Sequence, residues 1–301
     1  MLTISLLIFS TLLLVTLVIE YTFALNNTVE ISNNRIRVRT WWFICAICIP
    51  VFIAGGWTIT LLIYVLIYWA AFEFSRLLNL RTNSLTILFF TSCLISYHFL
   101  SFIYFDSLSI FFYTPLLFFL ASITVPNWLP RIKPLRAALV LMLCITSIFS
   151  IELIRQQCET LNLDAGLVIL FLFFITASND IFQYFSGKKF GRRPLAQNLS
   201  QHKTYEGALG GVMLTTITCM LTLPYIIDTT GLTAALIGFV IAIFGIAGDL
   251  NISYLKRRAN VKDSGTSLPG HGGLLDRIDS LTFTAPGFGL CLGLVSTSLN
   301  F

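Results

Sequence analysis

Apolar runs long enough to cross a lipid bilayer recur along almost the whole chain, and short loops separate them. A helical run of about 18 or more apolar residues spans about 30 Å of hydrocarbon. Charged residues make up only 11% of the 301 residues, against about 25% in soluble domains. The sequence therefore predicts an all-α, polytopic integral membrane protein without a separate soluble domain. About ten transmembrane helices are expected, at 3–25, 41–54, 57–74, 84–105, 107–125, 137–153, 165–185, 207–227, 232–250 and 280–299.

The first three runs need a closer reading. The run from Leu2 to Leu25 follows no basic segment and is longer than the apolar part of a signal peptide, so it is interpreted as a membrane helix. The runs 41–54 and 57–74 are short and meet at Gly55 and Gly56. This pair is either two crossings or a re-entrant hairpin.

Basic residues are distributed unevenly between alternate loops. If the ten spans are right, all of the 19 Lys and Arg residues except Arg155 fall on one side. Because basic loops stay in the cytoplasm, we expect both termini outside a bacterial inner membrane and the loops 186–206 and 251–279 inside the cell. We divide the chain into an extra N-terminal helix with its loop (1–38), an N-terminal membrane region (39–164) and a catalytic membrane region (165–301). The net charge of +5 comes from these loops and predicts no nucleic-acid binding.

Carboxylates stand at the cytoplasmic ends of two predicted helices, Asp180 and Asp249. Such residues are costly in a membrane unless they are paired, hydrated or bound to a metal. Asp249 shares a helical face with a hydroxyl and two cations, at spacings of i+4, i+7 and i+8: Ser253, Lys256 and Arg257. Two interpretations are open, a metal site or interfacial carboxylates paired with nearby cations.

A glycine-rich stretch follows this face and holds Gly265, Gly270, Gly272 and Gly273. Glycines let backbone amides approach a phosphate closely. Asp276 and Asp279 come next, one helical turn apart, and carboxylate oxygens suit Mg²⁺. The loop 186–206 holds five basic residues but lacks the Walker A pattern. It is either a phosphate-binding loop or an ordinary cytoplasmic basic loop.

The run from Ser253 to Asp279 resembles the motif of the phosphatidate cytidylyltransferase family, also called CDP-diacylglycerol synthases. The pattern S-x-x-K-R, K-D-x-G, P-G-H-G-G and D-R-x-D is matched by Ser253, Lys256, Arg257, Lys262, Asp263, Gly265, Pro269, Gly270, His271, Gly272, Gly273, Asp276, Arg277 and Asp279. A second family block is matched by Asn179, Asp180, Tyr184, Gly187, Phe190, Gly191, Ser200, Lys203, Thr204, Glu206 and Gly207. The segment from Arg39 to Phe74 also resembles family helices that end in Glu-Phe.

The resemblance implies transfer of a cytidylyl group from CTP to phosphatidate, or to a similar lipid phosphate, at the bilayer surface. It implies Mg²⁺ held by Asp249 and Asp276, with Asp180 and Asp279 next, and a monovalent cation such as K⁺ beside it. The catalytic set is Asp249, Asp276, Lys256, Arg257 and Asp263. The substrate-binding set is Ser253, Lys262, His271, Gly272, Gly273, Arg277, Lys203, Glu206, Lys188 and Arg192. A homodimer is one expected assembly.

The chain departs from the family pattern at Ile252, where family members commonly carry Glu. This replacement leaves the aspartates intact but keeps two alternatives open, a transferase for another lipid phosphate and a weak or inactive paralogue. A transporter is disfavoured because transporters place polar sites near the membrane midplane, whereas here the charges gather at one face.

Overall fold

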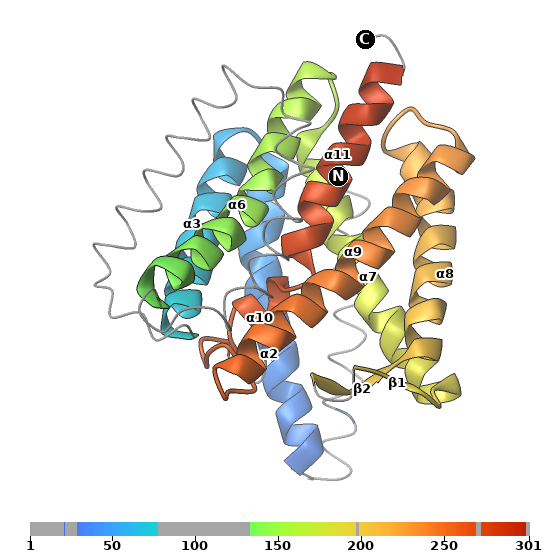
Figure 1. Ribbon diagram of the computed structural model, residues 1–301. Helices are drawn as coiled ribbons and strands as arrows, with labels where there is room; N and C mark the ends of the chain where they lie inside the picture. The colour runs from blue at the N-terminus through green and yellow to red at the C-terminus, as the bar shows by residue number, and fades with distance from the viewer. Residues whose placement is uncertain (1–20, 22–28, 78–132, 197–198, 269–271, 299–301) are drawn as a thin grey trace.

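The computed structural model describes Tyr21 and residues 29–77, 133–196, 199–268 and 272–298 (Figure 1). Its elements are α2 (Val29–Ala54), α3 (Trp57–Leu77), α6 (Lys133–Thr160), α7 (Ala165–Phe190), β1 (Pro194–Ala196), β2 (Ser200–Thr204), α8 (Tyr205–Thr222), the 3₁₀ turn η2 (Leu223–Tyr225), α9 (Gly231–Arg258), α10 (Leu275–Ile278) and α11 (Leu281–Ser298). The all-α prediction fits this helical bundle. It missed one feature, the short antiparallel hairpin formed by β1 and β2.

Five helices among the described residues are long and apolar enough to cross a membrane: Trp57–Leu77, Ala165–Phe190, Tyr205–Tyr225, Gly231–Arg258 and Leu275–Val295. They correspond to the predicted spans 57–74, 165–185, 207–227, 232–250 and 280–299. The apolar part of α2, Trp42–Ala54, is shorter, and α6 is helical over 137–153 without being among the five. The predicted spans 3–25 (apart from Tyr21), 84–105 and 107–125 lie outside the described residues, so a total of ten is not confirmed.

The turn between α2 and α3 is built on the two glycines noted in the sequence. Gly55 and Gly56 have φ values of +66° and +51°, which glycine adopts without the steric cost that a Cβ brings. The Thr58 hydroxyl donates to the Val51 and Gly55 carbonyls at 3.0 and 2.7 Å. α2 also extends back to Val29, well before the expected start at residue 41.

A buried face of α3 packs against α6. Ile59, Ile63 and Ile67 line this face at a spacing of four residues and are completely or almost completely buried. On α6, the basic residue that breaks the charge asymmetry, Arg155, forms ion pairs with Glu152 at 2.8 Å and with Glu159. Its charge is therefore balanced locally.

Close contact between α7 and α8 depends on glycine. A Cβ atom placed on Gly207 would lie 2.9 Å from the Gln183 carbonyl oxygen and 3.0 Å from the Gly187 Cα. These neighbours are backbone atoms, so they cannot move aside as a flexible side chain would. The two helices are therefore held at backbone contact next to the β-hairpin that joins them.

Replacing Gly207 with alanine is expected to push α7 and α8 apart and to destabilise the protein by about 1–3 kcal/mol. Gly231→Ala is the matched control, because its nearest atoms are Met220 side-chain carbons at 3.8 and 3.9 Å. Thermal unfolding in detergent would measure both. Equal melting temperatures for the two variants would contradict the packing argument.

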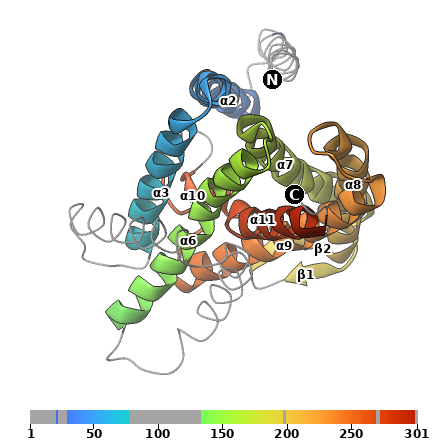
Figure 2. The same cartoon turned by 90° about the horizontal axis from the view of Figure 1, so that it is seen from above.

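α11 lies at the centre of the bundle. Viewed from above, it is enclosed by α6, α7 and α9 (Figure 2). In the most apolar 18-residue stretch of Leu275–Val295, 78% is buried. The Thr176 and Thr284 hydroxyls are hydrogen bonded at 3.0 Å and link α7 to α11. α8 lies at the edge and exposes apolar side chains such as Leu209 and Met213, as expected of a surface that faces lipid.

The polar connections gather at one end of the bundle. α7 and α9 end there, and the β-hairpin and α10 lie at the same lower end in Figure 1. Residues 259–274, here called the glycine loop, join α9 to α10, and residues 269–271 within it lie outside the described part. The fold thus places both predicted loops together. The division of the chain at 38 and 164 stays a prediction.

Candidate active site

Three aspartates from different elements approach one another at this end, and we call them the acidic cluster: Asp180 of α7, Asp249 of α9 and Asp279 just after α10. Asp279 is almost fully buried. The charges of Asp180 and Asp249 act on Asp279, and Asp249 also acts on Asp180. Like charges held together in a poorly hydrated site repel, so the cluster favours a cationic partner.

Local packing explains why the three aspartates meet. A Cβ on Gly248 would lie 2.9 Å from the Asp279 carbonyl oxygen and 3.0 Å from that of Ser280, so only glycine lets α9 approach this turn. The Ser280 hydroxyl donates to both oxygens of Asp180, at 3.2 and 3.1 Å. The Ser280 amide donates to Asp279 at 2.9 Å. Ser280 thereby bridges two members of the cluster.

Asp249 has two partners on the open side of the cluster. Lys203, from β2, forms an ion pair with its Oδ2 atom, and the Ser253 hydroxyl donates to its Oδ1 atom at 3.2 Å. Both ion-paired side chains are about one fifth exposed. The sequence left open whether a helix-end carboxylate is paired with a cation, and Asp249 is so paired here. Lys203 therefore stands next to the acidic cluster, at the end of the β-hairpin.

Asp276 points to the glycine loop and not into the acidic cluster. Its Oδ2 atom accepts hydrogen bonds from the Ser264 and Gly273 amides at 2.8 and 2.9 Å. Its Oδ1 atom accepts from the Lys256 ammonium at 2.8 Å, and both of these side chains are largely buried. Asp276 is thus a fixed anion that folds the glycine loop onto α9.

A second carboxylate, Glu73, anchors the same loop from α3. Its Oε1 atom accepts from the Ser267 hydroxyl and, at 2.9 Å, from the Leu274 amide. Its Oε2 atom accepts from the Ser264 hydroxyl at 3.0 Å and the Leu275 amide at 2.9 Å. Glu73 is 4% exposed. Its four donors lie about 200 positions further along the chain.

Two glycines let the loop close around these carboxylates. A Cβ on Gly273 would lie 2.2 Å from the Ser264 hydroxyl and 2.5 Å from Glu73 Oε2. Gly272 has a φ of +83°, and a Cβ there would lie 2.8 Å from Asp276 Oδ2. Both positions were predicted as part of a nucleotide loop, and the structure places them against its two anchors.

The predicted phosphate-binding cations occupy different surroundings. Lys256 is buried against Asp276. Arg257 is exposed and donates to the Leu199 and Val261 carbonyls at 3.2 and 3.0 Å, which ties the β-hairpin to the end of α9. Lys262, Asp263 and Arg277 are exposed, and the charge of Arg277 acts on Asp180 of the acidic cluster. Solvent can therefore reach these last three residues.

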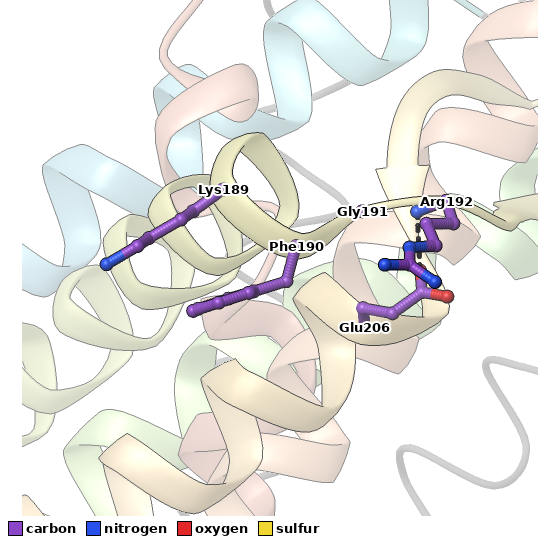
Figure 3. Close-up of a pocket in the computed structure, with 5 residues that line it drawn as sticks. All are labelled: Lys189, Phe190, Gly191, Arg192 and Glu206. Carbon is purple, nitrogen blue, oxygen red and sulfur yellow. Dashed lines mark hydrogen bonds between the residues drawn. The ribbon is translucent and has the colours of Figure 1, made fainter.

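The basic residues at the end of α7 surround a separate shallow pocket of about 340 Å³. Figure 3 shows its lining residues, Lys189, Phe190, Gly191, Arg192 and Glu206. Glu206 accepts from the Arg192 amide at 2.9 Å and from the next amide at 3.2 Å, so it holds the turn before β1. No aspartate of the acidic cluster lines this pocket. Lys188 lies over the ring of Tyr184 instead, 5.9 Å from its centre.

The donor chemistry of the acidic cluster fits Mg²⁺, which prefers carboxylate oxygens. Within the described ranges, no three His, Cys, Asp or Glu residues are close enough to hold a metal ion by themselves. Mg²⁺ is usually held by one or two carboxylates together with substrate phosphates and water, so a complete protein cage is not required. Asp249 must release Lys203 to offer Oδ2. No described feature bears on a monovalent cation.

The structure thus sorts the predicted site residues into groups. Asp180, Asp249 and Asp279 come together with Ser253 and Lys203, whereas Asp276 joins Lys256 and the glycine loop. His271 lies outside the described residues. Glu73 was absent from the predicted site, although it is the Glu of the Glu-Phe pair at the end of a family-like helix. A carboxylate at the end of the apolar run 57–74 was the signal that could have identified it.

Comparisons with known proteins agree with the motif resemblance. The model of the "Cytidylyltransferase family" matches residues 35–295. The uncharacterized protein YnbB of Escherichia coli K12 is 50% identical over 130 residues, which cover 43% of this chain and 44% of the relative. The phosphatidate cytidylyltransferase of Aquifex aeolicus is 41% identical over 134 residues, 44% of this chain and 50% of the relative. That of Bacillus subtilis is 40% identical over 147 residues, 46% and 52% of the two chains.

These alignments span about half the length of the curated relatives. The family model covers far more of the chain, from α2 into α11. It takes in the acidic cluster, the glycine loop and Glu73, and it confirms the resemblance drawn from the motifs. The chain is therefore a member of the cytidylyltransferase family, built as a helical integral membrane protein.

Proposed function

We propose that the protein transfers the cytidylyl group of CTP to phosphatidate and releases CDP-diacylglycerol and pyrophosphate. The observation that carries this proposal is that one stretch of α9 joins the two groups. Gly248 packs on the carbonyl of Asp279 in the acidic cluster, and Lys256 binds Asp276, which holds the glycine loop. A lipid phosphate lies at the level where membrane helices end, and CTP arrives from water. The relatives named phosphatidate cytidylyltransferase support this choice of substrates.

The proposed reaction is an in-line displacement. A phosphatidate oxygen forms a bond to the α-phosphorus of CTP, and the bond from that phosphorus to the oxygen bridging to the β-phosphate breaks. Positioning and charge stabilisation supply most of the rate in such reactions, so no covalent nucleophile is required. Bound Mg²⁺, held by Asp249 with Asp180 or Asp279, would neutralise phosphate charge.

The chain's own residues have distinct parts in this proposal. Lys203 is beside Asp249 and is placed to move from that carboxylate to a phosphate. Lys262 and Arg277 are exposed cations that can hold the triphosphate. Lys256 stays with Asp276 and keeps the glycine loop in place.

Purified protein in detergent micelles with CTP, Mg²⁺ and phosphatidate tests the proposal. We expect equal amounts of pyrophosphate and CDP-diacylglycerol. A parallel panel of other lipid phosphates addresses Ile252, whose side chain is completely buried in the apolar core. Turnover only with another lipid phosphate would overturn the choice of phosphatidate, and no turnover with any acceptor would overturn the enzyme assignment.

We also propose that this end of the bundle faces the cytoplasm of a bacterial inner membrane. The one-sided distribution of basic residues supports this orientation. In Lys262→Cys, labelling by an impermeant thiol reagent should exceed that of the parent protein only after the cells are permeabilised. Labelling of intact cells would contradict the orientation. The homodimer and the monovalent cation stay predictions.

A further inference from the structure

We propose that Glu73 is a positioning residue for the nucleotide: as a carboxylate on α3, it fixes the glycine loop and thereby the placement of the CTP phosphates. This inference rests on the proposed function for its substrate, but its structural half stands on contacts alone. The carboxylate of Glu73 connects the N-terminal membrane region to the loop of the catalytic region.

The arrangement of donors requires a carboxylate and not merely a polar side chain. Each Glu73 oxygen receives a different backbone amide, Leu274 on Oε1 and Leu275 on Oε2. The Leu274 amide also donates to the Ser267 hydroxyl at 3.3 Å, so Leu275 depends more strictly on the carboxylate. Glutamine has one acceptor oxygen and one NH₂ group, so either orientation of its amide faces an N–H with another N–H. The serine hydroxyls can rotate to accept, but the backbone amides cannot.

The same carboxylate acts where the loop is most tightly folded. The Ser264 hydroxyl donates to Glu73, while the Ser264 amide donates to Asp276. A Cβ on Gly265 or Gly273 would press on the Glu73 oxygens, at 3.2 and 2.5 Å. The loop is therefore held between two carboxylates, one from α3 and one from α10. Release of the α3 anchor would remove one of the two carboxylates that hold Ser264 and would loosen the neighbouring open part of the loop, which carries Lys262 and Asp263.

Hydrogen exchange followed by mass spectrometry tests the anchor without any substrate. In Glu73→Gln, a peptide covering residues 272–278 should exchange about tenfold faster or more, because an unpaired buried amide opens readily. Glu159→Gln is the matched control, since Glu159 is an exposed partner of Arg155, and its exchange at 272–278 should equal that of the parent. Unchanged exchange in Glu73→Gln would overturn the anchor.

Kinetics separate positioning from general damage. We expect Glu73→Gln to raise the KM for CTP about tenfold, with a smaller change in the KM for the lipid. Glu73→Asp, which keeps a carboxylate on a shorter arm, should retain more activity than Glu73→Gln. The reverse order would show that side-chain shape matters and charge does not, and would overturn the proposal.

A second variant covers the case in which Glu73→Gln does not fold. The substitution Ser264→Ala removes one of the four donors and leaves the carboxylate in place. Ser267 is kept, because its hydroxyl also accepts from the Leu274 amide. It should give a smaller rise in exchange and in the KM for CTP, and no change in either would overturn the anchor. A parent protein that fails to use CTP would overturn the proposed function, while faster exchange in Glu73→Gln would still support the anchor.

Discussion

Asp249→Asn is expected to lower CTP turnover by about 10²-fold or more, with little change in folding. Asp249 is the member of the acidic cluster that faces Lys203 and Ser253 on the open side. The substitution keeps its shape but removes the charge that would bind Mg²⁺. Pyrophosphate release with CTP and phosphatidate measures the effect, and a melting curve in detergent checks the fold.

Two further variants separate a metal ligand from a simple ion-pair partner. Asp228→Asn is the control, because Asp228 is an exposed aspartate near the α8–α9 connection, at the opposite end of the bundle. Lys203→Ala removes the partner of Asp249 and keeps the carboxylate. If pairing with Lys203 were the only role of Asp249, then Asp249→Asn, Lys203→Ala and the double variant that combines them would lose equal activity. Near-normal turnover in Asp249→Asn would rule out the metal assignment.

Asp276→Asn is expected to reduce both activity and stability. The asparagine amide must point its NH₂ group either at the Lys256 ammonium or at the Ser264 and Gly273 amides, all of which are donors. Breaking a buried ion pair costs about 3–5 kcal/mol, and these side chains are only 11% and 6% exposed. A clear fall in melting temperature should therefore accompany the loss of turnover.

The ion pair between Arg155 and Glu159 provides the comparison for stability. The Glu159 side chain is 55% exposed, so Glu159→Gln should cost less than about 1 kcal/mol. If Asp276→Asn lost activity but melted like the parent, Asp276 would act on the substrate or its metal and would not hold the loop. That result would restore the sequence-based assignment of Asp276 as a metal ligand.

The sequence predicted the membrane helices well where a single segment carries the signal. Span length and apolar content are local properties, so α3, α7, α8 and α11 were placed within about five residues, whereas α9 runs on to Arg258, past its predicted end at 250. Gly55 and Gly56 also marked a turn through their local conformational freedom. The β-hairpin was missed because its strands are short and polar, and contacts from elsewhere hold it, such as the bond from Arg257 to Leu199.

In the candidate site, too, contacts between distant segments could not be predicted from the local sequence. Asp180 and Asp249 were predicted at helix ends, but α7 continues to Phe190 and α9 to Arg258, so both lie inside their helices. The structure brings them together with Asp279. Spacing alone grouped Asp276 with Asp279. In the structure, Asp276 binds Lys256 of α9 and the glycine loop, whereas Asp279 lies with Asp180 and Asp249. Glu73 lies about 200 positions before the amides that it binds. No local pattern reports such a pairing.

The central position of α11 has a consequence for biogenesis. The ribosome delivers the chain from its N-terminus, so α6, α7 and α9 enter the membrane before the helix that they enclose. Until α11 arrives, they lack the buried surface that α11 contributes, and Asp279 and Ser280 cannot meet Asp180. Assembly of the acidic cluster is therefore one of the last steps of insertion, so a half-made protein lacks the complete candidate site.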